Sequence, residues 1–553
     1  MPTIKVIYSD LNKLIGRKIS KDELEELILL NKCEVDAWND DEMEIEVTSD
    51  RIDLLSTEGL ARTLKGFLEI ELGPPKYQIT KSNLKINVDP VVDQVRPFIV
   101  GGIVEDVELS DEGVAQIMQC QEKLHMTHSR MRKKASIGLH DLDKINPPVT
   151  YTARRPDEIY FVPLHEMKAM DGYEILRKVE KGVEYAHIIN DFEVYPLLVD
   201  SQDTVLSLPP IINSVDTAVE PETKNLFFEI TCLDEQIANY ALNVLVTNIA
   251  ERKGKIKSVE IIYPDGKTRV LPDLTPETHI LHLNYANQVL GLNLTIKELE
   301  HLILKLRMSS KRLDENILEV YTPAYRSDFL HEIDLLEDIA VAYGYNKISP
   351  ELPIVKTIGK ETPIEVKARK IRNLMAGFGF QEVNNYVLTS KEILFEKMNK
   401  DEGEIVELAN PITSTYSVLR NQLLPGMLNF LNSNNHAVFP QKCFEIGDVV
   451  KLDKKAMTKT QNVKHLCAVI TAYSTSFEQI QSILFSVLNY LGLKDYKLDE
   501  NDDNSFIPGR SATIKLGRKE IGLMGEVNFP VIEKFQLENP VIAFEIDISS
   551  IFS

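Results

Sequence analysis

The chain has 553 residues, 43% hydrophobic and 26% charged, which indicates roughly three to four globular domains, each able to bury its own core. Its net charge of −22 and pI of about 5.1 exclude a protein that binds nucleic acid chiefly through its own Lys and Arg residues. Any contact with RNA is therefore expected to be local or shared with a more basic partner.

The N-terminal residues and the spacing of the cysteines predict in which cellular compartment the protein is found. The N-terminus lacks a basic-then-apolar signal pattern, and the chain has no run of 18 consecutive apolar residues. We therefore expect a cytoplasmic protein without a membrane span. The five cysteines have neither zinc-ligand nor redox spacing and are expected to be reduced core residues: Cys33, Cys120, Cys232, Cys443 and Cys467.

One stretch of the chain occurs twice. Residues 14–55 match residues 289–330 without a gap, at a constant offset of 275 positions. Each copy opens an amphipathic helix with a capping box, at Ser20 in the first and Thr295 in the second. Each then runs through a short strand to an Arg-x-Asp turn. The constant spacing predicts one supersecondary unit used twice, a helix, a strand, an acidic turn and a second helix.

Pro-containing breaks and changes of composition divide the chain into four proposed domains. The first holds the first repeat, the second has short β-type runs with two helices, and the third holds the second repeat. The fourth begins with a helix and continues with strands. Their expected ranges are 1–78, 79–271, 272–350 and 351–553.

The second domain is expected to be α+β with a largely antiparallel sheet, interrupted by helices near 114–124 and 237–252. Its segments 136–151 and 208–231 are rich in polar groups beside prolines. His140 with Asp141 is the nearest approach to a catalytic pair, and alone this pair is typical of a turn. Five polar residues of a rigid turn are candidates for lining a small-molecule pocket: Asn213, Ser214, Thr217, Thr223 and Asn225.

The densest basic run of the chain lies at 128–134, between the predicted helix 114–124 and the polar segment 136–151. A solvated loop and a phosphate contact explain this run equally well, and both stay open.

The second repeat ends in an acidic turn and helix. The first copy keeps one acid, Asp53, which a side-chain-to-backbone hydrogen bond in the turn explains. Where the second copy has three further acids, the first has Gly59, Arg62 and Thr63. The second copy has four acids: Asp328, Asp334, Glu337 and Asp338. Asp328 precedes a helix that is predicted from Glu332 to Gly344. The other three stand at i, i+3 and i+4, so they share one face of that helix.

Two interpretations of these four carboxylates stay open. Hard oxygen donors gathered in this way suit Mg²⁺ or Ca²⁺ rather than zinc. A solvated acidic first turn that complements the helix dipole explains them without any ligand.

The last domain is expected to form an antiparallel sheet with helices on one side. Its helices are expected at 366–380, 421–434 and 476–491. The candidate strands are 382–390, 404–410, 442–450, 465–473, 511–517, 521–527 and 541–549.

The whole chain resembles the β subunits of phenylalanyl-tRNA synthetase, in their short, archaeal type. The resemblance rests on stretches in all four proposed domains, in the order of the family. They are IEVTSDRIDLLSTEGLARTL (45–64), IGLHDLDKINPPVTY (137–151), LPPIINSVDTAVEPETKNLFFEIT (208–231), RSDFLHEIDLLEDIAVAYGY (326–345), VLRNQLLPGML (418–428), KCFEIGDVV (442–450), FIPGRSATI (506–514) and GEVNFPVIEKFQLENPVIAFEIDI (525–548).

The resemblance implies an α₂β₂ heterotetramer that charges tRNA(Phe) with phenylalanine and uses ATP. Residues 79–271 would hydrolyse tyrosine mischarged onto tRNA(Phe), and residues 351–553 would form a class II synthetase-like fold that contacts the α subunit. The four acids carried over from the family, Asp328, Asp334, Glu337 and Asp338, would bind Mg²⁺ at the β–α contact.

The last domain is expected to lack the residues that bind ATP in a working class II site. Such a site needs an Arg-x-Glu on a strand, and we expect none in residues 355–553, because Arg420 is followed by Asn-Gln and Arg510 by Ser-Ala; nor does a late Gly-x-Gly strand lead to an Arg. Aminoacylation chemistry would then belong to the α subunit. A free-standing tRNA deacylase and a non-enzymatic scaffold remain the alternative functions.

Overall fold

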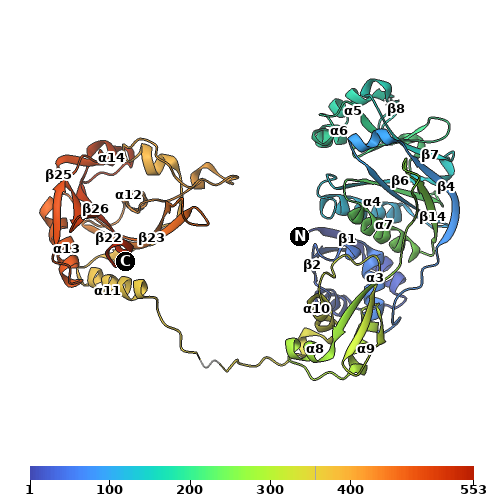
Figure 1. Ribbon diagram of the computed structural model, residues 1–553, viewed down its shortest axis with the longest axis horizontal. Coiled ribbons are helices and arrows are strands. Elements are labelled where there is room, and N and C mark those ends of the chain that lie inside the picture. The colour runs from blue at the N-terminus through green and yellow to red at the C-terminus, as the bar shows by residue number, and fades with distance from the viewer. Residues whose placement is uncertain (355–356, 553) are drawn as a thin grey trace. The chain divides into compact units, whose positions relative to one another are not determined.

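The computed structural model describes residues 1–354 and 357–552. The chain is an α+β multidomain protein with two compact units, Met1–Glu351 and Leu352–Ser553, which are described separately (Figure 1). No helix within the described residues is long and apolar enough to cross a membrane.

The first unit contains two copies of one small α+β fold. Their three-stranded sheets have the same strand order, β1-β3-β2 in one and β16-β18-β17 in the other. The first copy comprises β1 (Thr3–Ile7), α1 (Tyr8–Ile15), α2 (Lys21–Leu30), β2 (Cys33–Asn39), β3 (Glu42–Val47) and α3 (Thr57–Phe67). The second comprises β16 (Glu277–His282), α8 (Leu283–Leu290), α9 (Ile296–Lys305), β17 (Ser309–Arg312), β18 (Ile317–Thr322) and α10 (Glu332–Tyr343).

Local sequence signals set the helix ends in both copies. The Ser20 hydroxyl accepts a hydrogen bond from the Glu23 backbone N–H, and Thr295 forms a full capping box with Glu298. Helices α1 and α8 both stop at a glycine in the left-handed conformation, with φ 80° and 67°. The same elements therefore recur in the order that the internal sequence match predicts.

A largely antiparallel ten-stranded sheet forms the middle of the first unit. Its order is β12-β11-β10-β7-β4-β14-β5-β13-β6, with β15 paired to β14, and only β14–β4 and β4–β7 are parallel among its described pairs. The strands are β4 (Thr80–Val88), β5 (Phe98–Glu105), β6 (Ala135–Asp141), β7 (Val149–Arg154), β10 (Tyr195–Val199), β11 (Val205–Leu208), β12 (Ile212–Asn213), β13 (Leu226–Cys232), β14 (Lys255–Ile262) and β15 (Thr268–Leu271).

Two long helices of this region, α4 (Asp111–Met126) and α7 (Glu235–Ala250), agree with the helices predicted from the sequence. The sequence did not predict the two short helices α5 (Gly172–Lys178) and α6 (Glu180–Tyr185). One continuous apolar core joins the first repeat to the sheet and to α7.

The sheet curls until its two ends meet. The Asn213 amide of β12 donates to the Leu139 carbonyl of β6 at 3.1 Å, although these strands stand at opposite ends of the strand order. Polar side chains from different strands are thereby brought together at the line where the two ends of the sheet meet, which we call the seam.

The second unit is built on a seven-stranded sheet of order β19-β22-β23-β27-β26-β25-β24. The strands are β19 (Gln381–Glu382), β22 (Gln441–Leu452), β23 (Thr460–Thr471), β24 (Tyr496–Glu500), β25 (Phe506–Leu516), β26 (Lys519–Val527) and β27 (Val541–Asp547). Two residues each form β20 (Leu388–Thr389) and β21 (Val418–Leu419), which pair outside this sheet.

The expectation of helices on one side of this sheet is wrong. Helices α11 (Pro363–Gly377) and α13 (Phe477–Tyr490) pack on one face, and α12 (Leu424–Ser433) and α14 (Phe529–Lys534) pack on the other. Adjacent strand residues alternate between these two cores, so a sheet covered on both faces has an almost continuous apolar sequence rather than a clear period of two.

Two candidate strands of this unit are also wrong. Of residues 382–390 only short pieces are paired, and residues 404–410 contribute a single bridge between Glu407 and Val418.

Candidate functional site

The acidic turn of the second repeat is organised around a buried arginine. Arg326 donates from Nε and Nη2 to the two carboxylate oxygens of Asp328, at 2.8 and 2.6 Å, and from Nη2 to Asp338 at 2.7 Å. Burial alone would lower the pKa of Arg326, but the two carboxylates raise it well above its usual value. A guanidinium therefore lies between two of the four predicted metal ligands.

The other two acids face different partners. Glu337 pairs with the Lys32 ammonium of the first repeat at 3.0 Å, and the same ammonium lies 3.8 Å from Asp338. Asp334 accepts the backbone N–H groups of Leu330 and His331, both at 2.8 Å, and so caps the start of α10. One helix face thus presents its three acids to three different environments.

The carboxylate oxygens have the right chemistry for Mg²⁺, but their arrangement in this structure does not fit a bound ion. Among residues 1–354 and 357–552, no three His, Cys, Asp or Glu side chains are placed to hold a metal.

The matching turn of the first repeat corrects one expectation. Asp53 is held by the Arg51 side chain, with two hydrogen bonds of 2.9 Å, rather than by a backbone group of its own turn. Burial alone would raise the pKa of Asp53, but the charge and hydrogen bonds of Arg51 lower it to about 2. The two repeats therefore share an Arg–Asp pair as well as a backbone.

A second candidate site lies at the seam of the curled sheet. Glu229 sits in the middle of β13 and is 2% exposed, and its Oε1 accepts a hydrogen bond from the Ser207 hydroxyl of β11 at 2.9 Å. His140 of β6, fully buried, lies across from it with Nε2 4.0 Å from Oε1. On its other side His140 Nδ1 hydrogen-bonds the Thr217 hydroxyl at 2.8 Å. We call these four residues the seam cluster.

The seam cluster has unused hydrogen-bonding capacity. In the described part of the chain, neither Oε2 of Glu229 nor Nε2 of His140 has a hydrogen-bond partner, although both atoms are buried. A buried polar group left unpaired is costly, and such groups mark places where a ligand or water binds. Gly138 makes the room, because a Cβ at this position would lie 2.3 Å from Glu229 Oε1.

The structure brings together some of the residues that the sequence singled out. His140 and Thr217 meet directly, and the Asn213 amide reaches the backbone beside His140. Asp141 caps a turn, as expected, whereas His140 lies in a buried strand rather than in that turn.

The other polar residues of segment 208–231 lie away from the cluster. Ser214 bonds Asp216, Thr223 bonds Asp141 and Asn225 bonds Asp143.

Sequence reasoning missed Glu229 and Ser207. The available signal was a charged residue inside the apolar strand 226–231, since a carboxylate is rarely buried unless paired or functional.

The basic run 128–134 contains one residue that fits neither a solvated loop nor a phosphate contact. Arg132 is buried and donates to the carbonyls of Pro210 and Ile211 and to the Glu122 carboxylate, so it braces the loop before the seam cluster. Arg130 and Lys133 are exposed.

Two arginines of the second unit, Arg420 and Arg510, are engaged within the chain. Arg420 is buried and donates to Glu445 at 2.6 Å and to two backbone carbonyls. Arg510 pairs with Glu526 at 2.8 Å. The expectation that Arg-x-Glu is absent is wrong in its literal form, because residues 518–520 read Arg-Lys-Glu. Arg518 lies, however, in the turn from β25 to β26, Lys519 and Glu520 begin β26, and all three are exposed.

Comparison with known proteins covers the chain from end to end. Four family models match in order: the Phe-tRNA synthetase beta subunit B1 domain at residues 1–70, the B3/4 domain at 121–257, the tRNA synthetase B5 domain at 280–345 and the phenylalanyl tRNA synthetase beta chain CLM domain at 348–548.

Full-length relatives carry the same assignment. The chain is 42% identical to the phenylalanine–tRNA ligase beta subunit of Pyrococcus furiosus, over 100% of both chains. It is 40% identical to that of Methanocaldococcus jannaschii, over 99% of this chain and 100% of the relative. The crystal structure of an N-terminal fragment of the Pyrococcus horikoshii phenylalanyl-tRNA synthetase beta subunit matches 62% of this chain and all of the fragment, with 41% identity and a TM-score of 0.60.

These matches define the chain as a subunit of an aminoacyl-tRNA ligase. It belongs to the family of phenylalanine–tRNA ligase β subunits.

Proposed function

We propose that the chain assembles with an α subunit as an α₂β₂ heterotetramer in the cytoplasm, which charges tRNA(Phe) with phenylalanine at the expense of ATP. The α subunit activates the amino acid. This chain contributes contacts to tRNA, removal of mischarged tyrosine, and carboxylates for Mg²⁺ at the contact with α. The observation that carries this proposal is the match to four family domains, in order, along the whole chain.

The two alternative functions are less well supported. A free-standing deacylase needs only the middle domain and leaves the duplicated unit and the second unit without a role. A scaffold without chemistry leaves unexplained the two buried atoms of the seam cluster that have no hydrogen-bond partner among the described residues, Oε2 of Glu229 and Nε2 of His140.

The seam cluster supports the editing role chemically. A buried carboxylate with a free oxygen is a strong acceptor for the phenol hydroxyl of tyrosine, which phenylalanine lacks. A site that pairs a substrate hydroxyl discriminates strongly against an analogue without it. We assign Glu229 to this contact, with Ser207 holding its other oxygen in place. His140, oriented by Thr217, is the nearest group able to exchange a proton with an attacking water.

Editing is tested with Thr217→Ala and Asn213→Ala in the assembled enzyme. Each change removes a hydrogen bond that orients His140 or its strand, so Tyr-tRNA(Phe) hydrolysis should slow by roughly 10- to 100-fold while charging with phenylalanine continues. The control is Asn225→Ala in the same segment, because the hydrogen bonds of its amide within the described residues go to Asp143 and to the Asp106 backbone, not to the seam cluster. Unchanged hydrolysis in both variants would place the editing pocket elsewhere in the domain.

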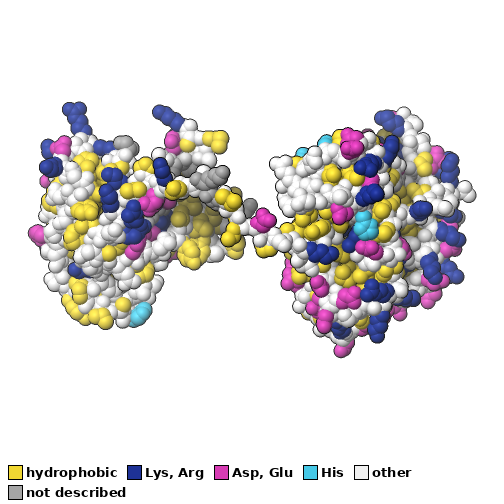
Figure 2. All heavy atoms as spheres, turned by 90° about the horizontal axis from the view of Figure 1, so that it is seen from below, with side chains coloured by type: hydrophobic (Ala, Val, Ile, Leu, Met, Phe, Trp, Pro, Cys, Tyr) yellow, Lys and Arg dark blue, Asp and Glu magenta, His cyan; other side chains and the backbone are white. Residues whose placement is uncertain are grey.

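Recognition of tRNA is expected to depend on few local contacts. Figure 2 shows Lys and Arg side chains interspersed with Asp and Glu on the face in view. With a net charge of −22, the chain binds phosphate only where a few cations are exposed, such as Arg130 and Lys133.

The metal proposal applies to the assembled enzyme. Asp334 and Glu337 lie at the partly exposed side of α10, and a partner that supplies further oxygen donors would complete a hard-ion site with Asp328 and Asp338. Binding there requires at least one carboxylate to leave Arg326 or Lys32, so the isolated chain is expected to bind Mg²⁺ weakly.

The double change Asp334→Asn with Glu337→Gln tests this role. Assembly with α, followed by mass measurement, should weaken and become insensitive to added Mg²⁺. The isolated chain should melt at nearly its original temperature, because Asn still caps a helix, the Glu337 side chain is exposed, and Lys32 keeps Asp50 and Asp338 as neighbours. Adding acids at Gly59 and Arg62 of the first repeat would not serve as a control, since a Cβ at Gly59 would lie 1.7 Å from the Asp53 carbonyl oxygen.

A better control is Glu34→Gln with Asp36→Asn, which removes two exposed charges from the first repeat. If the two double variants assemble equally well, the acids of α10 have no role in the contact.

A further inference from the structure

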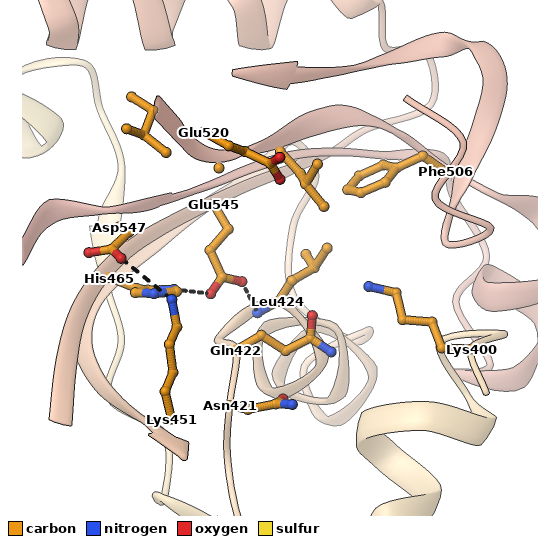
Figure 3. Close-up of a pocket in the computed structure, with 13 residues that line it drawn as sticks. Lys400, Asn421, Gln422, Leu424, Lys451, His465, Phe506, Glu520, Glu545 and Asp547 are labelled. Atoms are coloured by element: carbon orange, nitrogen blue, oxygen red, sulfur yellow. Dashed lines mark hydrogen bonds and ion pairs between the residues drawn. The ribbon is translucent and has the colours of Figure 1, made fainter. Parts of the chain in front are cut away.

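The second unit contains a cavity of about 300 Å³ that the proposed function does not use. It opens over one face of the seven-stranded sheet, between β22, β23, β26 and β27 and the start of α12 (Figure 3). On β23 and β27, His465 and Asp547 are direct partners in the strand register, as are Cys467 and Glu545. These side chains therefore project from the same face of the sheet.

Glu545 fixes the orientation of His465. Its carboxylate accepts the backbone N–H groups of Leu423 and Leu424 at the start of α12, both at 2.9 Å, and His465 Nδ1 at 2.6 Å. Burial alone would raise the pKa of Glu545, but the hydrogen bonds from His465, Leu423 and Leu424 lower it. A carboxylate only accepts hydrogen bonds, so Nδ1 donates to Glu545, and in the neutral tautomer with that N–H the other ring nitrogen, Nε2, is an acceptor.

That acceptor is unused within the chain. His465 is 8% exposed, lines the cavity, and among the described residues offers no partner to Nε2. A buried imidazole nitrogen in this state calls for a donor from a ligand.

An ion pair lies beside His465. The Lys451 ammonium lies 3.4 Å from the Asp547 carboxylate, and Figure 3 shows both next to His465 on one side of the cavity, with Lys400 and Phe506 across from them. One side thus offers an ammonium, a carboxylate and a neutral acceptor.

The remaining walls are of a different kind. Leu424, Phe506 and Leu523 provide apolar surface. A volume of about 300 Å³ is at the lower end for small-molecule pockets, which suits a ligand smaller than a nucleotide. Phosphate is disfavoured, because Glu520, Glu545 and Asp547 line the same space as the two lysines.

We propose that this cavity binds one free α-amino acid with an apolar side chain, as the zwitterion. The ligand ammonium donates to His465 Nε2 and Asp547, its carboxylate accepts from Lys451, and its side chain packs on Leu424, Phe506 and Leu523. The site is separate from phenylalanine activation, which is assigned to the α subunit, so it stands or falls independently of the proposed function.

The test is calorimetric titration of the full chain, free of α subunit, with L-phenylalanine and L-leucine. Both should bind saturably with one site per chain. Phenethylamine, which lacks the carboxylate, and hydrocinnamate, which lacks the ammonium, should bind at least about 10-fold more weakly, because each loses a hydrogen bond between charged groups.

A matched pair of variants locates the site. Lys451→Gln removes the cation that holds the ligand carboxylate and should weaken L-phenylalanine binding about 10-fold. Lys454→Gln removes an exposed charge from the turn between β22 and β23 and should leave binding unchanged. Three results would each overturn the proposal: absence of saturable binding at millimolar ligand, binding of either truncated probe as tightly as L-phenylalanine, or equal effects of the two variants.

Discussion

At the scale of single residues, buried Arg–Asp pairs make part of the stability depend on pH. The pKa of Asp53 is held at about 2, below its ordinary value of 3.8, by Arg51. A depressed carboxyl pKa contributes stability that is present above about pH 4 and is lost as the pH falls toward 2. Asp53 should account for about 2 kcal/mol of the free energy of unfolding lost across this window.

Asp53→Asn measures this contribution. The variant should be less stable at pH 7, by about 3–5 kcal/mol, because the Arg51 guanidinium is left buried without its partner. The free energy of unfolding from urea titrations between pH 5 and 2 should also fall less steeply than in the original chain. Parallel curves for the two proteins would show that Asp53 titrates normally and would contradict the assignment.

At the scale of one element, helix α10 carries two neighbouring acids whose substitution should lower the free energy of unfolding by very different amounts. Asp338 is 1% exposed and bonds the buried Arg326, whereas the Glu337 side chain is 53% exposed and pairs with Lys32. Asp338→Asn should lower the free energy of unfolding by about 3–5 kcal/mol, because it removes one partner of a buried ion pair. Glu337→Gln should change it by less than about 1 kcal/mol.

Thermal and urea unfolding of the isolated chain measure both changes. A similar, small effect of the two substitutions would mean that Asp338 is not engaged by Arg326, and would favour the solvated acidic turn for the whole helix.

At the scale of the whole molecule, amino-acid activation is expected to require the second subunit. Arg420 and Arg510 are bound to carboxylates of their own unit, which leaves neither free to polarise ATP phosphates. The chain alone should show no phenylalanine-dependent exchange of pyrophosphate into ATP, and addition of α subunit should restore exchange. Exchange by a preparation proven free of α subunit would refute this division of labour.

Much of the architecture follows from local patterns. The capping boxes at Ser20 and Thr295, the apolar periodicity and the constant spacing predict the duplicated unit, because each of these signals acts within one or two helical turns. The sheet of the second unit was harder to predict, since residues facing two different cores lose the period of two that marks a half-exposed strand.

The candidate sites depended on contacts between distant residues. Ser207 reaches Glu229 only because the ten-stranded sheet curls and its ends meet, and Lys32 reaches Glu337 only because the two repeats pack together. Sequence spacing identified Asp328, Asp334, Glu337 and Asp338 as a group, but the direction of each side chain was decided by packing, which turned Asp338 inward to Arg326 and Glu337 outward to Lys32. Local propensity does not encode such directions, since they depend on which cations the tertiary fold places beside each carboxylate.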